Sequence, residues 1–206
     1  DGMVNVPLSD AVALRVNGVW NQSDGWVQDA ATGKDLWPEE NWAMRAALKW
    51  DITDETSATL TWDHDQIDQL ARPAIGLVAL DASGTSAPFP PDPATYLNPL
   101  KAGVYNDVIG NEESRKLDAA TLFIDHSFSW SDFRSTTAWR TFETVNREDE
   151  DGTNRIALYF DTANIEDNTS FYQVFKFSGQ SDAVDWVAGV SYYSEDAKQA
   201  SVTHAF

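Results

Sequence analysis

The segment "WAMRAALKW", residues 42–50, has an apolar side chain at every second position and a tryptophan at each end. The apolar series is Trp42, Met44, Ala46, Leu48 and Trp50. Arg45 and Lys49 lie between them and point to the other side of an extended chain, because successive side chains of a strand alternate. The period of two predicts a β-strand with one face that is apolar in its middle and aromatic at both margins.

The same alternation recurs along the chain and predicts an all-β fold. It is found at 11–20, 57–65, 120–130, 133–142, 171–179 and 184–195, and residues 3–6 resemble the end of a further strand. In one of these segments, Phe133 and Trp139 share a face opposite Arg134 and Arg140. We therefore expect an antiparallel up-and-down meander of about eight long strands.

The connections between these segments alternate between short turns and long loops. Short turns are expected at 7–10, 51–56, 131–132 and 180–183. Long loops are expected near 21–41, 66–116 and 143–169, and after residue 196. In a meander, this alternation places every short turn at one end of the strands and every long loop at the other. That layout is typical of an outer-membrane β-barrel, in which the long loops are extracellular.

A bilayer also explains tryptophan at the strand margins, because Trp and Tyr concentrate at the two membrane interfaces. The predicted lipid-facing aromatic belt comprises Trp20, Trp42, Trp50, Trp62, Trp130 and Trp139. Two alternatives stay open. A soluble β-sandwich, such as a carbohydrate-binding module, would bury most of these side chains in a central layer. A small complete outer-membrane barrel would instead pair its first strand with its last.

Composition narrows the classes of partner and fold. The 206 residues have a formal net charge of −19, which argues against nucleic acid as a partner. The chain has no cysteine, so it has no disulfide framework and no thiolate metal site. No apolar run is long enough for a transmembrane helix. The start at Asp1, without methionine and close to a strand-like stretch, favours a mature form or a fragment.

Several strands resemble the barrel of TonB-dependent outer-membrane receptors. The resembling stretches are "VNVPLSDAVALRVNGVWNQSDGWV" (4–27), "TGKDL" (32–36), "NWAMRAALKW" (41–50), "FRSTTAWRTF" (133–142) and "NTSFYQVFKFSG…VDWVAGVSYYSED" (168–196). The resemblance implies that residues 1–206 are a partial barrel domain, a fragment from the middle of a transmembrane barrel of about 22 strands. A plug domain, which closes such barrels, has no counterpart in this sequence.

The resemblance also implies a function, a location and partners. Receptors of this family lie in the outer membrane of Gram-negative bacteria and take up scarce nutrients or metal chelates, iron-siderophores among them. The inner membrane supplies the energy through TonB, which acts on the plug. The chain is therefore expected to contact outer-membrane lipid, a small-molecule nutrient and its own plug, with TonB acting through that plug.

Signatures of catalysis are nearly absent from the sequence. His64, His126 and His204 are far apart and lack metal-ligand spacing, and no nucleophile elbow or phosphate-binding loop is present. We therefore expect neither enzymatic activity nor a cofactor.

The acidic stretch "REDEDGTN" (147–154) invites a calcium interpretation. An EF-hand register fails, because Arg147 and Leu158 would occupy positions that require acidic side chains. Irregular calcium binding by Asp149, Glu150 and Asp151 stays an alternative to a solvated loop tip.

Ligand contacts are expected from loop aromatics and from arginines on the inward strand face. The predicted ligand-binding residues are Trp26, Trp37, Tyr96, Arg45 and Arg140. Loops on a rigid scaffold commonly carry binding residues. We favour the alternative interpretation that the loops merely pack and that the strand arginines pair with neighbouring acids such as Asp63 and Asp125.

Overall fold

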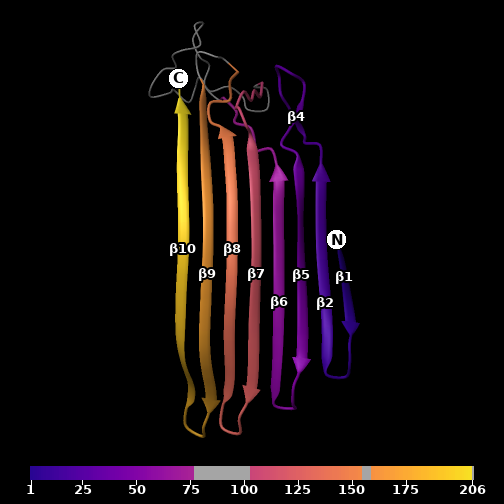
Figure 1. The fold of residues 1–206 in the computed structure, drawn as a ribbon, viewed down its shortest axis with the longest axis vertical. Coiled ribbons are helices and arrows are strands. Elements are labelled where there is room, and N and C mark those ends of the chain that lie inside the picture. The colour runs from indigo at the N-terminus through magenta and orange to yellow at the C-terminus, as the bar shows by residue number, and fades with distance from the viewer. Residues whose placement is uncertain (77–102, 155–158, 206) are drawn as a thin grey trace.

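The computed structural model describes residues 1–76, 103–154 and 159–205, which form one eight-stranded sheet (Figure 1). Its strands are β1 (Gly2–Pro7), β2 (Val12–Ser23), β5 (Glu39–Asp51), β6 (Thr56–Gln69), β7 (Glu112–Ser127), β8 (Asp132–Asp149), β9 (Phe160–Gln180) and β10 (Asp185–Ala205). They lie side by side in chain order, and every neighbouring pair is antiparallel. The predicted all-β, up-and-down meander is therefore confirmed.

Two very short strands, β3 (Val27–Gln28) and β4 (Asp35–Leu36), form a separate hairpin in the loop between β2 and β5. In the described part of the chain, no helix has the length and apolar character needed to cross a membrane.

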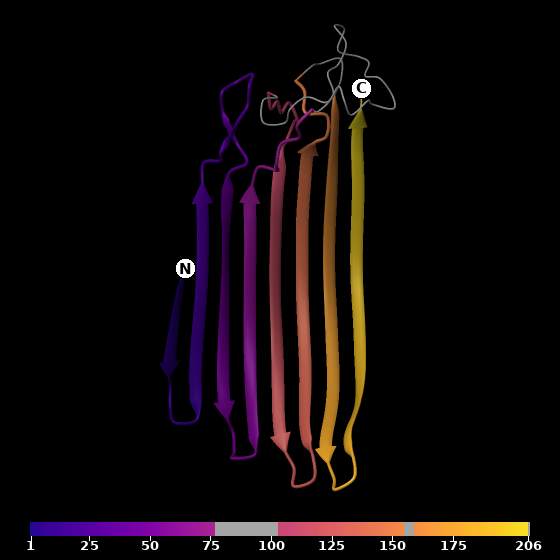
Figure 2. The same ribbon diagram turned by 180° about the vertical axis from the view of Figure 1, so that it is seen from behind.

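The tight turns all lie at one end of the sheet and the longer connections at the other (Figure 1 and Figure 2). The turns join β1 to β2, β5 to β6, β7 to β8 and β9 to β10. Backbone hydrogen bonds close them, for example from Leu8 N to Val12 O at 2.8 Å and from Ser181 N to Val184 O at 2.9 Å. This separation of short turns from long loops is the arrangement found in outer-membrane barrels.

The strands are longer than the sequence pattern predicts, chiefly at the end that carries the long loops. β8 continues to Asp149 and β9 begins at Phe160, so much of the predicted loop 143–169 is strand. β10 continues to Ala205, and the loop expected after residue 196 is wrong. In these extensions polar side chains occur on both faces, so the hydrophobic period of two disappears while the backbone stays extended.

The other two predicted loops are also shorter than expected. β6 continues to Gln69 and β7 begins at Glu112, both inside the predicted loop 66–116. The predicted loop 21–41 contains the end of β2, the β3–β4 hairpin and the start of β5. Its regular structure fixes the positions of loop side chains that sequence patterning left undefined.

Trp130 lies in the turn between β7 and β8 and not in a strand, because β7 ends at Ser127. The strand predicted over 120–130 is therefore too long at this end. Trp130 still stacks against Phe177 and Trp186, with ring centroids 6.3 and 6.1 Å apart. It thus belongs to a group of aromatic side chains at the tight-turn end of the sheet.

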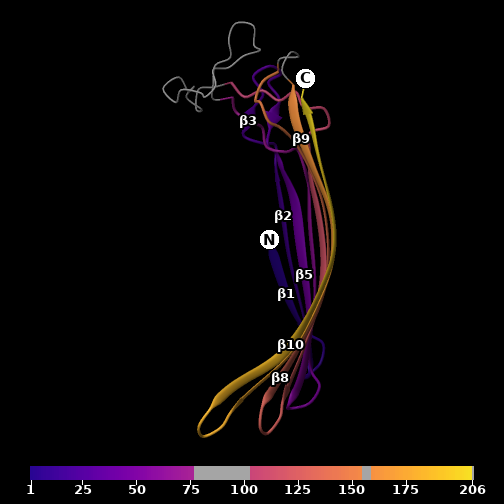
Figure 3. The same ribbon diagram turned by 90° about the vertical axis from the view of Figure 1, so that its left-hand side faces the viewer.

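The sheet is a single curved layer when it is seen edge-on (Figure 3). Among the described residues, the buried apolar side chains are only Leu36, Ala71 and Ala163. Large apolar side chains are instead exposed; Trp20, for example, is 64% exposed. A β-sandwich would bury its tryptophans between two sheets. The described residues have no such central layer, which argues against the sandwich alternative.

Cross-strand register places five of the predicted belt tryptophans on one face of the sheet. Trp20 on β2 is opposite Trp42 on β5, and Trp50 lies on the same face of β5 because it is an even number of residues from Trp42. Ala46, also on that face of β5, is opposite Trp62 on β6. Trp62 and Trp139 are both opposite Ala120 of β7, one on each side of it. We call this the tryptophan face, defined by Trp20, Trp42, Trp50, Trp62 and Trp139. The other side is the arginine face, defined by Arg15, Arg45, Arg134 and Arg140.

The middle of the tryptophan face is a row of leucines. Leu14, Leu48, Leu60 and Leu122 are direct cross-strand partners on β2, β5, β6 and β7. Leu48 and Leu60 are 37% and 47% exposed. On β5 this row is flanked by Trp42 and Trp50, and a segment of about 9–11 residues suffices for a tilted strand to cross a bilayer. The surface therefore has the apolar middle and aromatic margins expected of a lipid-facing sheet.

β1 and β10 are the two edges of the sheet. In the described residues, β1 pairs with β2 alone and β10 pairs with β9 alone. The first and last strands of the sheet therefore do not pair with each other. A small complete barrel would require that they did.

Candidate functional site

The arginine face carries ion pairs between neighbouring strands. Arg45 on β5 is the direct cross-strand partner of Asp63 on β6, and its Nε donates a hydrogen bond to Asp63 Oδ1. Arg134 Nε donates in the same way to Asp125 Oδ1 at 2.6 Å. The expectation that strand arginines pair with Asp63 and Asp125 is thus confirmed. Because both arginine side chains are exposed, each pair contributes about 1 kcal/mol or less to stability.

Arg140, the other arginine predicted to contact ligand, lies on β8 opposite Ser170 of β9. Its side chain is exposed. Glu195 of β10 is also opposite Ser170, and it accepts a hydrogen bond from Asn168 Nδ2. Arg140 therefore lies in a polar row of the arginine face, and its contact with ligand stays a prediction.

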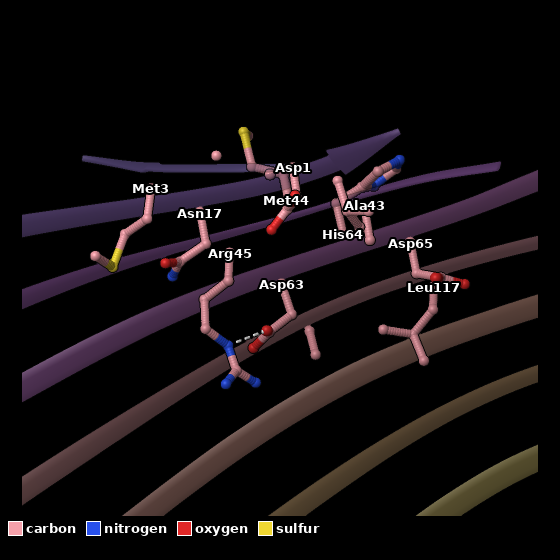
Figure 4. A pocket seen from close by; sticks show the side chains of 14 residues that line it. Asp1, Met3, Asn17, Ala43, Met44, Arg45, Asp63, His64, Asp65 and Leu117 are labelled. Carbon is pink, nitrogen blue, oxygen red and sulfur yellow. Dashed lines mark hydrogen bonds and ion pairs between the residues drawn. The ribbon is translucent and has the colours of Figure 1, made fainter. Parts of the chain in front are cut away.

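A broad depression of about 790 Å³ lies beside Arg45 (Figure 4). Side chains from β1, β2, β5, β6 and β7 line it, among them Met3, Asn17 and Leu117. Arg45 and Asp63 point toward one another within it. The Arg45 guanidinium, which lines this depression, therefore already has a carboxylate partner, which an anionic ligand would have to displace.

Asp29 anchors the β3–β4 hairpin. Its side chain is 5% exposed, and Oδ1 accepts hydrogen bonds from the backbone N–H groups of residues 31–32 at 2.8 and 2.9 Å. Its Oδ2 accepts a further bond from Asn106 N at 3.3 Å, and Ala30 N donates to Val104 O at 2.8 Å. These bonds fix the hairpin on a second loop segment that is distant in sequence.

Trp26 and Trp37 meet at the base of this hairpin. Their ring centroids are 5.2 Å apart and their planes are inclined by 33°. Val27 and Leu36 pair directly between them, which brings the two tryptophans to the same end of the hairpin. The structure thus brings together two of the predicted ligand-contacting aromatics. The third, Tyr96, lies outside the described residues.

Carboxylates also gather at the long-loop end. Asp149 is 4% exposed, and its Oδ1 accepts a hydrogen bond from the backbone N–H of Asp151 at 3.2 Å. Burial raises the pKa of Asp149 to about 6, and the negative charges of Asp151 and Asp107 act in the same direction. Within 1–76, 103–154 and 159–205, no group of three His, Cys, Asp or Glu side chains is arranged to hold a metal ion. The structure therefore gives no support to calcium binding by Asp149, Glu150 and Asp151.

The raised pKa of Asp149 predicts a pH dependence of the segment around it. A carboxyl group whose folded pKa exceeds its unfolded value stabilises the fold at low pH, and this stabilisation is lost as pH rises through about 6. We expect the free energy of opening of residues 148–154 to fall by about 1–3 kcal/mol between pH 4 and pH 8. Hydrogen exchange, corrected for intrinsic rates, measures this energy. Asp149→Asn should abolish the dependence, whereas Glu150→Gln should retain it. An unchanged pH profile in Asp149→Asn would contradict the prediction.

The three histidines make separate hydrogen bonds. Their partners are Asp118 for His64, Thr56 for His126 and Asp161 for His204. Asp161, which is 1% exposed, also accepts a hydrogen bond from Tyr159. The contact between His204 and Asp161 could not be predicted from the sequence pattern, which assigns both 143–169 and the residues after 196 to loops. Persistent strand pairing between β9 and β10 places His204 opposite Asp161.

Two solved structures share the arrangement of this sheet. The ferric yersiniabactin uptake receptor FyuA from Yersinia pestis matches with a TM-score of 0.69 at 14% sequence identity, over 98% of this chain and 29% of that one. The siderophore receptor PiuA from Acinetobacter baumannii matches with a TM-score of 0.67 at 16% identity, over 96% of this chain and 28% of that one. This sheet has the same fold as part of the β-barrel in these two proteins.

The similarity to these receptors is a similarity of fold, and it extends over only part of the length of each receptor. This chain spans 29% and 28% of the two receptors, which is consistent with a partial barrel. No family model and no curated protein matches its sequence. At identities of 14% and 16%, the structural match establishes the architecture and leaves the ligand to separate evidence.

Proposed function

We propose that this chain is a wall segment of a TonB-dependent outer-membrane receptor that takes up a scarce nutrient, such as an iron-siderophore. The tryptophan face carries the proposal. Its large apolar side chains are exposed on a sheet that, in its described residues, has almost no buried apolar core. Surfaces of this kind are stable against lipid and aggregate in water. FyuA and PiuA, whose structures are similar to this sheet, are receptors, which supports transport and not catalysis.

Each part of the sheet would have a distinct role in such a receptor. The tryptophan face would contact the lipid of the Gram-negative outer membrane. The arginine face would line the interior, where its paired charges stay hydrated beside the plug. The long-loop end, with Trp26 and Trp37, would meet the nutrient from outside the cell. TonB would act through the plug, which is not among the described residues. The described part of this chain would contribute part of the barrel wall and part of the surface that binds the nutrient.

The proposal is tested in the Gram-negative organism that has this gene. We expect fractionation to place the chain in the outer membrane. Deletion of the gene should abolish uptake of one radiolabelled ferric siderophore or a comparable nutrient, and loss of TonB should have the same effect. Complementation with the intact gene is the control. Recovery of the chain in the soluble fraction, or uptake that is independent of TonB, would contradict the proposal.

A further inference from the structure

Trp26 and Trp37 form an indole pair in which the Trp26 side chain is exposed and the Trp37 side chain is half-buried. Trp26 is 76% exposed, although its ring contacts that of Trp37. Trp37 also has a φ of 60°, the one positive φ at a residue other than glycine in the described ranges. A left-handed conformation is unfavourable for a residue with a bulky side chain. Backbone strain of this kind is concentrated at active sites and ligand-binding sites. The strained backbone at Trp37 holds its half-buried indole against the exposed ring of Trp26.

The pair is mounted on a rigid base. The buried Asp29 carboxylate ties the hairpin to Asn106, and Ala30 N donates to Val104 O. Gly25 packs so closely that a Cβ there would lie 2.2 Å from Leu36 O. The indole pair is therefore held in place before any ligand arrives, which lowers the entropic cost of binding.

The charge around the indole pair is negative. Residues 21–41 contain five acids, Asp24, Asp29, Asp35, Glu39 and Glu40, against one base, Lys34. Four of those acids are exposed, and only Asp29 is buried. Asp24 lies two residues before Trp26, and both Asp35 and Glu39 lie two residues from Trp37. An anionic group would be repelled from this surface, whereas a cation would gain from the carboxylates and from the indole faces together.

We infer that Trp26 and Trp37 form a binding site for an organic cation, with the exposed Trp26 indole as the main contact, the half-buried Trp37 indole beside it and the neighbouring carboxylates as counter-charge. This inference rests on the proposed function, because it assigns the positive group to the nutrient that reaches the long-loop end. It narrows the ligand to molecules that present an alkylammonium or similar cationic group. Fully anionic chelates are disfavoured.

Fluorine NMR of the intact protein in detergent, labelled with fluorotryptophan, tests the inference. Choline is the probe, and dimethylbutanol, which has the same shape without the charge, is the matched control. We expect choline to shift the Trp26 and Trp37 resonances, assigned from Trp26→Phe and Trp37→Phe, and to leave Trp139 unchanged. Trp26→Ala should weaken choline binding about tenfold, as removal of a cation–π contact predicts. Asp35→Asn should weaken it a few-fold, with a reduced dependence on salt.

Three outcomes would overturn the inference. They are equal shifts with choline and dimethylbutanol, stronger shifts with benzoate than with choline, and no shift at Trp26 or Trp37 with any probe. The first two would assign the pair to neutral or anionic ligands. Outer-membrane fractionation is measured separately, so a protein that is correctly inserted but does not bind choline refutes only the cation site. A soluble protein would refute the proposed function.

Discussion

Leu60→Arg is expected to destabilise the membrane-inserted protein by about 2–4 kcal/mol, the cost of an arginine on the lipid face near the bilayer midplane. Leu60 lies in the middle of the leucine row and is 47% exposed on the tryptophan face. The measurement is the folding free energy in lipid vesicles, from urea titration with heat-dependent gel mobility as readout. Few buried contacts are lost in this substitution, so the expected effect comes from lipid.

Thr61→Arg is the matched control for this prediction. Thr61 is the next residue on β6 and points to the arginine face, opposite Ala47 and Thr121. An arginine there would stay hydrated, and we expect a change below about 1 kcal/mol. Equal destabilisation by the two substitutions, or a larger effect of Thr61→Arg, would show that the tryptophan face does not contact lipid.

Gly25→Ala is expected to destabilise the β3–β4 hairpin by about 2–4 kcal/mol and to separate Trp26 from Trp37. Gly25 has a φ of 95°, and a Cβ at this position would lie 2.2 Å from the backbone oxygen of Leu36. Neither the strain nor the clash can be relieved by rotation of a side chain. The exchange of two amide protons measures the loss: the Asp29 amide, which donates to Lys34 O within the hairpin, and the Ala30 amide, which donates to Val104 O of the neighbouring loop segment.

Gly33→Ala is the control that separates the cost of a positive φ from the cost of a steric clash in the same hairpin. Gly33 also has a positive φ, 70°, but an added Cβ would have no neighbour within 4 Å. We expect a cost of about 1 kcal/mol, the left-handed penalty alone. If the Asp29 and Ala30 amides were protected from hydrogen exchange to the same extent in Gly25→Ala as in Gly33→Ala, the close approach of Gly25 to Leu36 would not be what stabilises the hairpin.

Much of the fold was predictable because the proposed function implies a simple rule for a strand. In a bilayer, side chains of a barrel strand alternate between hydrocarbon and a wet interior, and the period of two in 42–50 fits this rule. Where both faces of a strand meet water, the rule no longer applies. The outer parts of β8, β9 and β10 were therefore interpreted as loop, although their backbone pairing continues to Asp149, Phe160 and Ala205. Trp130 was placed in a strand because its apolar character continues the alternation into the turn.

The candidate site was predictable where it depends on direct strand neighbours. Arg45 pairs with Asp63, and Arg134 with Asp125, because these residues are cross-strand partners in a meander. The contact between Trp26 and Trp37 depends instead on the path of a loop, which Asp29 fixes through bonds to a distant segment. No spacing rule encodes such a path. The two tryptophans could be named as candidates from sequence but not brought together.

The central claim is that one face of this sheet meets lipid and the other meets water. The chain has no cysteine, so single cysteines along β6 can each carry a nitroxide without background. Collisions of these nitroxides with oxygen and with a water-soluble nickel reagent, measured on the intact protein in lipid bilayers, report the two environments. We predict that labels at 58, 60 and 62 favour oxygen and that labels at 59, 61 and 63 favour nickel. Accessibility that does not alternate along 58–63, or that alternates with the opposite phase, would contradict the claim.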